Sequence, residues 1–192
     1  MTIDRSVPML VRVACGLAIA ALSLSAGPAP WSPGKERSGA ELSLAPAGEP
    51  GKRFTLEGRI LGLPDSLPVR DATVYLYHAD AHGRYSLQGE SRPRLAGTVH
   101  TDAAGGFRVR TILPGQYDGT PHLHLRLSGE DIHSEAATLS LARSHGAGSD
   151  TAYDRVPWMV KLPGEYWTYV EPDGDGGYIS RWTVYVKRSG RP

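Results

Sequence analysis

The sequence has little sulfur chemistry and no excess of charge. Cys15 is the single cysteine among 192 residues, which excludes a framework of disulfide bonds. Lys and Arg number 21 and Asp and Glu number 20, for a net charge of +1. Because the basic residues are scattered and matched by acidic ones, we expect no nucleic-acid partner. The sequence also lacks a phosphate-binding loop and a nucleophile elbow, which excludes the functions that depend on them.

Long apolar runs are absent as well. Residues 13–26 form a run that is too short to cross a membrane comfortably. Arg5 and Arg12 precede this run, and the small residues Ser25 and Ala26 end it before a proline-rich stretch. This pattern predicts a secretory signal peptide over residues 1–26, with an uncleaved N-terminal anchor as the alternative. We therefore expect a secreted or periplasmic protein that has no membrane attachment after cleavage.

The rest of the chain divides into two parts by composition. Residues 27–52 are rich in Pro, Gly, Ala, Glu and Ser without periodicity, and we expect a flexible leader there. Residues 53–192 show neither an internal repeat nor an amphipathic helix of useful length, and we expect them to form one domain.

Short segments rich in β-branched and aromatic residues, separated by Gly, Asp and Pro, predict an all-β domain, a sandwich or a barrel. We expect a hairpin connection at residues 102–107 and a closing hairpin over residues 171–177. A hairpin turn explains the acidic residues of 171–177 better than a calcium loop does. The expected strands cover residues 54–61, 72–79, 95–101, 107–113, 121–127, 136–142, 165–170 and 179–186.

The segment at 121–127, Pro-His-Leu-His-Leu-Arg-Leu, alternates strictly. In a strand, its three leucines point to one face, while His122, His124 and Arg126 point to the other. The two imidazoles are then roughly 6–7 Å apart at the backbone and can reach one metal ion. A His-x-His pair also occurs where histidines make ordinary hydrogen bonds, so its neighbours decide its meaning.

Two tyrosines lie near the histidine pair in the expected fold. Tyr117 is in a turn that Pro114 and Gly115 begin, and Tyr85 follows an Asp/Gly turn. Two phenols and two imidazoles form a hard set of oxygen and nitrogen donors. Such a set suits ferric iron better than zinc, because a trivalent cation prefers anionic oxygen.

These segments, from about Thr55 to Leu127, resemble the intradiol ring-cleavage dioxygenases, the group of protocatechuate 3,4-dioxygenase and catechol 1,2-dioxygenase. Four motifs occur in the family's order. They are Tyr-His-Ala-Asp ending in Gly-Arg-Tyr, then Thr-Asp-Ala-Ala-Gly, then Arg-Thr-Ile-Leu-Pro-Gly-Gln-Tyr, then Pro-His-Leu-His. The resemblance implies a β-sandwich that holds one non-haem Fe(III).

By motif position, the implied iron ligands are Tyr85, Tyr117, His122 and His124. The resemblance implies that a catechol-type diol binds the iron through both oxygens and displaces Tyr117, which then helps to deprotonate the diol. Dioxygen would cleave the ring between the two hydroxylated carbons. The implied partners are thus a small aromatic diol and O2, and no further cofactor is predicted.

The sequence departs from the family pattern at two functional positions. Gly119 stands where members carry an arginine three residues before the first histidine, and residues 133–143 lack the glutamine that members carry on the strand after the histidines. Arg126 is our candidate to replace the arginine as a catalytic residue, with Arg84 and Arg110 as further possibilities.

Three functional hypotheses follow. The first is an exported Fe(III) intradiol dioxygenase. The second is a non-catalytic binding or structural β-sandwich that keeps the fold, with or without the iron site. The third is a cupin-type His-x-His metal site, for which Glu130 lies too far along the chain.

Overall fold

Ten β-strands make up the fold in the computed structural model, which describes residues 35–36, 40–87, 91–117, 119–143 and 164–190. Within these ranges no helix is long and apolar enough to cross a membrane. The strands belong to the unit Ser32–Pro192. They are β1 (Lys35–Glu36), β2 (Glu41–Ser43), β3 (Arg53–Leu63), β4 (Thr73–His78), β5 (Leu95–His100), β6 (Gly106–Ile112), β7 (His122–Gly129), β8 (Ile132–Arg143), β9 (Glu165–Pro172) and β10 (Tyr178–Lys187).

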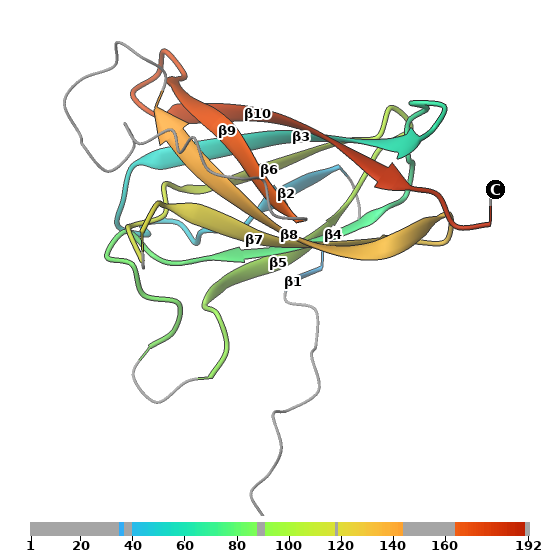
Figure 1. Ribbon diagram of the computed structural model, residues 1–192. Helices are drawn as coiled ribbons and strands as arrows, with labels where there is room; N and C mark the ends of the chain where they lie inside the picture. The colour runs from blue at the N-terminus through green and yellow to red at the C-terminus, as the bar shows by residue number, and fades with distance from the viewer. Residues whose placement is uncertain (1–34, 37–39, 88–90, 118, 144–163, 191–192) are drawn as a thin grey trace, which may run out of the picture. The chain divides into compact units, whose positions relative to one another are not determined.

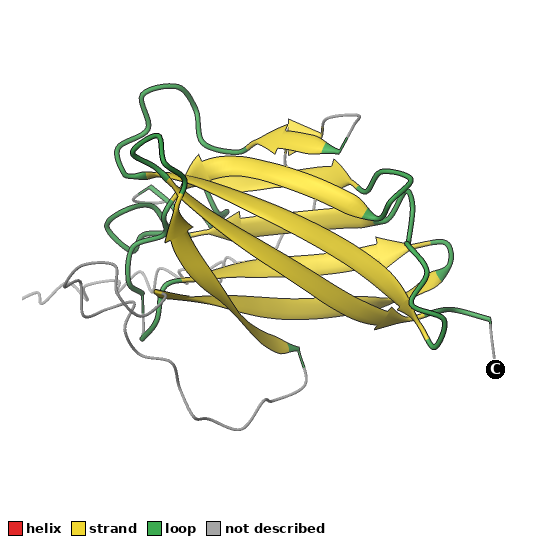
Figure 2. Cartoon of the chain, turned by 90° about the horizontal axis from the view of Figure 1, so that it is seen from above, coloured by secondary structure: helices red, strands yellow, loops and turns green. Residues whose placement is uncertain are grey.

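The strands form two layers that face each other, as Figures 1 and 2 show. Their hydrogen-bonded order is β1-β5-β4-β7-β8-β9-β10-β3-β6-β2. The strand β9 links the layers, because it pairs in parallel with β8 and at its other end antiparallel with β10. This arrangement confirms the predicted all-β sandwich.

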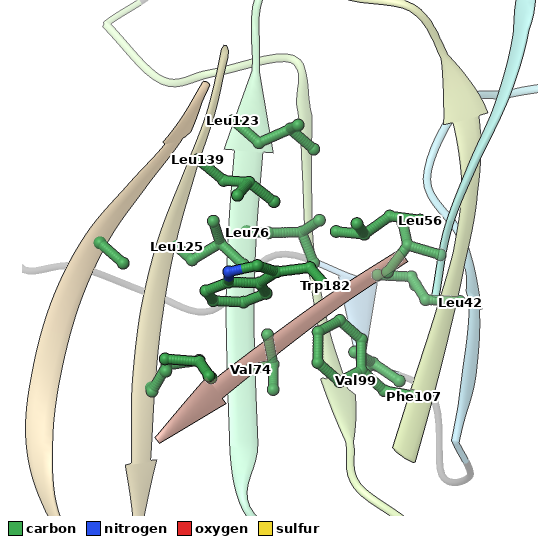
Figure 3. Packing of buried hydrophobic residues seen from close by; sticks show 14 of the residues in the cluster. Leu42, Leu56, Val74, Leu76, Val99, Phe107, Leu123, Leu125, Leu139 and Trp182 are labelled. Atoms are coloured by element: carbon green, nitrogen blue, oxygen red, sulfur yellow. The ribbon is translucent and has the colours of Figure 1, made fainter. Parts of the chain in front are cut away.

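The core lies between the layers and follows from the alternation of side chains along the strands. On β7, Leu123, Leu125 and Leu127 are at most 3% exposed. Leu56 of β3 and Trp182 of β10 enter the same core from the opposite layer (Figure 3). Burying the leucine side of β7 commits its other side, which carries the two histidines, to the outer face of the sheet.

All eight strands expected from the sequence are present, within a few residues of their expected limits. The closing hairpin is confirmed by the pairing of Tyr178 with Pro172 and of Ile179 with Glu171. In its turn, the Asp173 carboxylate accepts hydrogen bonds from the backbone N–H groups of Asp175 and Gly177, both at 2.8 Å. The Asp173 carboxylate therefore stabilises the turn.

The prediction of a flexible leader through residue 52 is wrong for residues 40–52. The strand β2 pairs in parallel with β6, and Leu42 and Leu44 are 0% and 3% exposed in the core. These two leucines bury enough apolar surface to hold a Pro- and Gly-rich segment in place. The expected signal peptide, residues 1–26, lies outside the described residues.

The expected hairpin at residues 102–107 is also wrong. The segment makes a tight turn, in which the Asp102 N–H donates to the Gly106 carbonyl at 2.9 Å. The flanking strands do not pair with each other, because β5 pairs with β4 in one layer and β6 pairs with β3 in the other. The turn therefore carries the chain from one layer to the other.

His78 joins the two layers by hydrogen bonds. It is fully buried on β4, and its Nδ1–H donates to the Ala79 carbonyl at 2.7 Å. Its Nε2 then accepts from the hydroxyl of Thr111 on β6 at 2.8 Å. Both ring nitrogens are used inside the core, so His78 is a packing residue that is not free to bind a metal.

Protonation of His78 is expected to destabilise the fold in acid. Burial, the main cause, lowers its pKa from 6.5 to about 4, although Glu49 and Asp80 favour the charged ring. The unfolded chain takes up this proton near pH 6.5, so the free energy of unfolding should fall as the pH drops from about 6.5 to about 4. At about 1.4 kcal/mol per pH unit, this contribution amounts to about 3 kcal/mol.

Urea unfolding of the wild type and of His78→Gln, measured across this pH range, tests the assignment. Glutamine lacks the titrating ring, so the free energy of unfolding of the variant should change less with pH. The carboxylates Glu49 and Asp80, whose pKa values are lowered, are present in both proteins, so the difference between the two curves reports the His78 ring and its coupling to them. Equal pH dependence in the two proteins would show that His78 is not the responsible group.

Candidate metal centre

Three predicted ligands converge on the outer face of β7. The hydroxyl oxygen of Tyr85 lies 3.0 Å from Nε2 of His122 and 3.1 Å from Nε2 of His124. The two Nε2 atoms are 3.2 Å apart. The centre of this nearly equilateral triangle is about 1.8 Å from each atom, so a point just above it is about 2.0–2.1 Å from all three, the length of a bond from a transition-metal ion to imidazole. The three atoms can therefore bind one ion.

The hydrogen bonds of the histidine rings favour the same conclusion. Nδ1 of His122 lies 2.7 Å from the carbonyl oxygen of Thr120. A carbonyl can only accept, so Nδ1 carries the proton, and a neutral ring presents its lone pair at Nε2. Metal-binding histidines commonly donate their other nitrogen in this way. The lone pair of His122 Nε2 is therefore directed at the point where the three atoms converge, and it is available to a cation there.

His124 is held in place by contacts from the two neighbouring strands. Tyr77 of β4 stacks on its ring at 4.7 Å between centroids, with 23° between the ring planes. Thr138 of β8 places its hydroxyl 3.5 Å from Nδ1. Both contacts follow from the strand register, in which Tyr77, His124 and Thr138 stand in one row across three strands.

Burial decides the protonation states of these groups without a metal. It raises the pKa of Tyr85 to about 12, with smaller contributions from the phenols of Tyr77 and Tyr117. Burial, followed by the neighbouring His122, lowers the pKa of His124. Near neutral pH the phenol is thus protonated and the imidazole is neutral, and a cation must displace the phenol proton to gain Tyr85 as an anionic ligand.

Tyr117, the fourth predicted ligand, lies beside the other three. Its ring meets that of Tyr85 edge to face, with 5.1 Å between centroids. It is 52% exposed, and no hydrogen bond joins its hydroxyl to the three converging atoms among the contacts of the described residues. The structure therefore brings three of the predicted ligands together and leaves the fourth beside them, exposed to solvent.

The loops that carry the two tyrosines touch through glycines. A β-carbon at Gly115 would lie 2.5 Å from the carbonyl oxygen of Ala81 and from the amide nitrogen of Gly83. A β-carbon at Gly83 would lie 2.2 Å from the carbonyl oxygen of Gln116. No side chain fits between the backbones at either position, so the Pro-Gly turn before Tyr117 is held against the turn before Tyr85.

The arginine candidates occupy different places. Arg126 is exposed on the same face of β7 as the histidines, in register with Tyr75 and Ala136. Arg84 and Arg110 form ion pairs with Asp80 at 3.2 Å and with Glu41 at 2.7 Å. Arg126 is thus the only one of the three that extends from the histidine face of β7.

The two departures from the family pattern have structural counterparts. Gly119 has a φ of +112°, which strains any residue with a side chain, so an arginine does not fit this backbone. The strand after the histidines is β8, and its residue opposite His124 is Thr138. The position beside His124 is therefore occupied by the short side chain of Thr138, and β8 contains no glutamine.

The third hypothesis finds less support. Glu130 is exposed and follows the last residue of β7. Within the described ranges, no group of three or more His, Cys, Asp or Glu side chains is placed to hold a metal ion. The donor set needs the Tyr85 phenol, which is a ligand typical of ferric iron rather than zinc.

Sequence reasoning did not identify Thr120 and Thr138 as partners of the histidines. The strand alternation of residues 136–142 does place Thr138 on one face, but the register with β7 decides which residue it meets. Thr120 acts through its backbone carbonyl, and no side-chain pattern signals that role.

The chain is similar to known dioxygenases in sequence and in fold. A sequence model of a family described as "Dioxygenase" matches residues 27–126, just over half of the chain. Catechol 1,2-dioxygenase 2 of Acinetobacter lwoffii is 33% identical over 75 residues, 38% of this chain and 27% of that protein. The protocatechuate 3,4-dioxygenase beta chain of Burkholderia cepacia is 34% identical over 107 residues, 47% of this chain and 45% of that protein. The chain thus matches less than half the length of either relative.

Among solved structures, the dioxygenase domain of a dioxygenase and carbohydrate-binding protein fusion from Streptomyces sp. SirexAA-E is similar in fold. The match has a TM-score of 0.58 and 23% identity, and covers 77% of this chain and 87% of that chain. At this level of identity, the match supports the fold and adds no residue roles.

Substitution of Gly115 by alanine is expected to weaken metal binding at least tenfold, because the added carbon pushes the Tyr117 turn away from the Tyr85 turn. Gly129→Ala is the control, since a β-carbon there would make its closest contact at an ordinary 3.4 Å from Ile132. Titration of both variants with Fe(III), using a competing chelator, measures the effect. Equal Fe(III) affinities would show that the contact between the two turns does not determine the geometry of the metal site.

Proposed function

Since the chain belongs to the intradiol dioxygenase family, we propose that it is an exported ferric iron enzyme that opens catechol-type aromatic rings with dioxygen. The convergence of Tyr85, His122 and His124 within 3.2 Å carries the proposal. The address outside the cytoplasm rests on the sequence pattern of residues 1–26. The substrate class and the metal rest on the donor set and on the relatives.

The proposed iron ligands are Tyr85, His122, His124 and Tyr117. Bound ferric iron would supply a Lewis acid and a redox partner that make the diol reactive toward dioxygen. Tyr85 and the two histidines would hold it, since their three atoms already converge. His122 and His124 are kept in orientation by Thr120 and Tyr77, so the ligand atoms need little rearrangement to bind.

Tyr117 is our candidate for the residue that handles protons. As a ligand it would be a phenolate, and it could accept a proton from the arriving diol and move away as a neutral phenol. Its exposed position beside the other ligands leaves room for this movement. Tyr85, which is more enclosed, would stay in place.

A surface for the aromatic ring lies next to the histidines. The outward residues of β8 that face β7 are Ala136, Thr138 and Ser140, all of them small. In the next strand, Trp167 stands in register with Ser140, in the same row as His122. We infer that a planar diol lies above the small residues of β8, with the indole ring toward its far edge.

Arg126 is our candidate for the residue that stabilises negative charge on the substrate. It extends from the same face of β7 as the ligands, two residues beyond His124. A guanidinium there would attract the anionic form of a diol and the charge that develops during cleavage. It would thus substitute for the arginine that the backbone at Gly119 does not admit.

The alternative is a sandwich that keeps the metal centre without catalysis. The conformation of Gly119 and the presence of Thr138 in place of a glutamine favour it. The two functions predict different responses to the same substrate, which makes them separable by experiment.

The proposed function is tested on the full chain reconstituted with Fe(III). Phenolate-to-iron charge transfer should colour the protein, added catechol should shift the absorption band, and oxygen should be consumed at one O2 per ring opened. Tyr117→Phe should weaken or shift the band, because one of two phenolates is lost. A coloured protein that consumes no oxygen with any simple catechol would support the alternative, and a colourless one would overturn both.

Substitution of Arg126 by glutamine should lower kcat for ring opening by about 10²-fold, the usual effect of losing one electrostatic stabiliser. The absorption band of the iron-loaded protein should stay unchanged, since Arg126 is not a ligand. Steady-state oxygen uptake and the visible spectrum give the two readouts. A wild-type kcat in the variant would show that Arg126 has no catalytic role.

A further inference from the structure

Tyr85 is the one of the three converging ligands that no strand holds. It lies in the connection between β4 and β5, whereas both histidines are on β7. A ligand on a loop keeps its position only if the loop is fixed by other contacts. In the described part of this connection, the contacts lead from Tyr85 to a group of charged side chains.

Asp80 organises the turn before Tyr85. Its side chain is 7% exposed, and Oδ1 accepts hydrogen bonds from the backbone N–H groups of His82 at 2.9 Å and Arg84 at 3.0 Å. The Asp80 N–H in turn donates to the Arg84 carbonyl at 2.8 Å. One carboxylate thus fixes the backbone as far as the residue before Tyr85.

Arg94 binds the same turn from the other end. Its backbone N–H donates to the Tyr85 carbonyl at 2.7 Å. Its guanidinium lies 3.6 Å from Oδ2 of Asp80 and forms two parallel hydrogen bonds, of 2.6 and 2.7 Å, with the carboxylate of Glu49. Arg94 therefore connects Tyr85, by its backbone, to two carboxylates, by its side chain.

Glu49 brings in a segment far away in the sequence. It follows β2 and its side chain is only 7% exposed, while that of Arg94 is 26% exposed. Because the pair is largely shielded from water, removing the Glu49 charge leaves the Arg94 guanidinium with only the longer contact to Asp80. The position of Arg94 therefore depends on Glu49, and that of the Tyr85 loop depends on Arg94.

We propose that Glu49, Arg94 and Asp80 form a positioning network that holds Tyr85 at the metal centre, so that the segment before β3 takes part in setting metal affinity. This inference rests on the proposed function, because it requires Tyr85 to be a metal ligand. In this network, none of the three charged residues contacts the metal or the substrate. They act through the backbone of residues 80–85 and 94.

A second group of charges in the described structure provides a matched control. On the outer face of the other layer, the Glu57 carboxylate lies 2.7 Å from the guanidinium of Arg108 and 3.3 Å from that of Arg181. Like Glu49, Glu57 is a glutamate that accepts a close hydrogen bond from an arginine, but it lies on β3 and its partners lie on β6 and β10, not on the loops of the metal centre. Loss of its charge alters surface electrostatics alone.

The test compares Glu49→Gln with Glu57→Gln in the full chain. In the metal-free proteins, amide hydrogen exchange should be faster at Arg84 and Arg94 in Glu49→Gln alone. Fe(III) affinity, measured by competition with a chelator, should fall about 10–100-fold in Glu49→Gln and less than twofold in Glu57→Gln. The phenolate-to-iron band of Glu49→Gln at saturating iron should shift from its wild-type position.

Arg94→Lys serves as the second variant, in case Glu49→Gln folds poorly. Lysine keeps the charge but not the fork that binds both oxygens of Glu49, so it should give a smaller loss of iron affinity in the same direction. Wild-type affinity and exchange in both variants would overturn the inference.

The outcomes separate this inference from the proposed function. A wild type that binds iron but opens no ring would overturn the enzymatic function and leave the positioning network to be judged by affinity. A wild type that opens rings, together with a Glu49→Gln variant of equal affinity, would overturn the network alone. A wild type that binds no iron would overturn both.

Discussion

The approach of one phenol oxygen to two imidazole nitrogens is the interaction on which the proposed function depends. Tyr85, His122 and His124 bring these atoms within 3.2 Å of one another, and the Nδ1–H of His122 is already donated to a carbonyl. A cation at the centre would satisfy all three lone pairs, which is why the proposed function places a metal ion there.

The strand β7 connects this site to the stability of the fold. Its leucines fill the core and its histidines face outward, so that one alternating segment serves both purposes. A shift of one residue in its pairing with β4 or β8 would bury imidazoles and expose leucines, which the core does not tolerate. The geometry of the ligands is therefore protected by the hydrophobic effect on the other face of the same sheet.

Much of this structure could be predicted from the sequence, for identifiable reasons. Alternation and turn residues located eight strands, and the motifs located the residues that converge. The leader was misjudged because Leu42 and Leu44 are few among prolines and glycines, and because a parallel partner such as β6 leaves no local signal. The turn at 102–107 looks the same whether its strands pair or separate into two layers.

The contacts that hold the predicted ligands in place could not be predicted from the sequence, for a different reason. Thr138 meets His124 through strand register, and Glu49 reaches Arg94 across 45 positions of the chain. Such pairs are decided by tertiary structure, while a motif records only neighbours along the chain. Arg126 remains a prediction, since its place on the histidine face of β7 agrees with a catalytic role without establishing one.

The pairing of β3 with β10 has a consequence for how the molecule is made. These strands run side by side over ten residue pairs, from Tyr178 with Phe54 to Lys187 with Leu63. During synthesis, β3 is made long before β10, and the layer that contains β3 cannot be completed until β10 is available to pair with it. Because contacts so distant in sequence form slowly, we expect this layer to stay open until β10 has been made, and the finished sandwich to unfold as one cooperative unit.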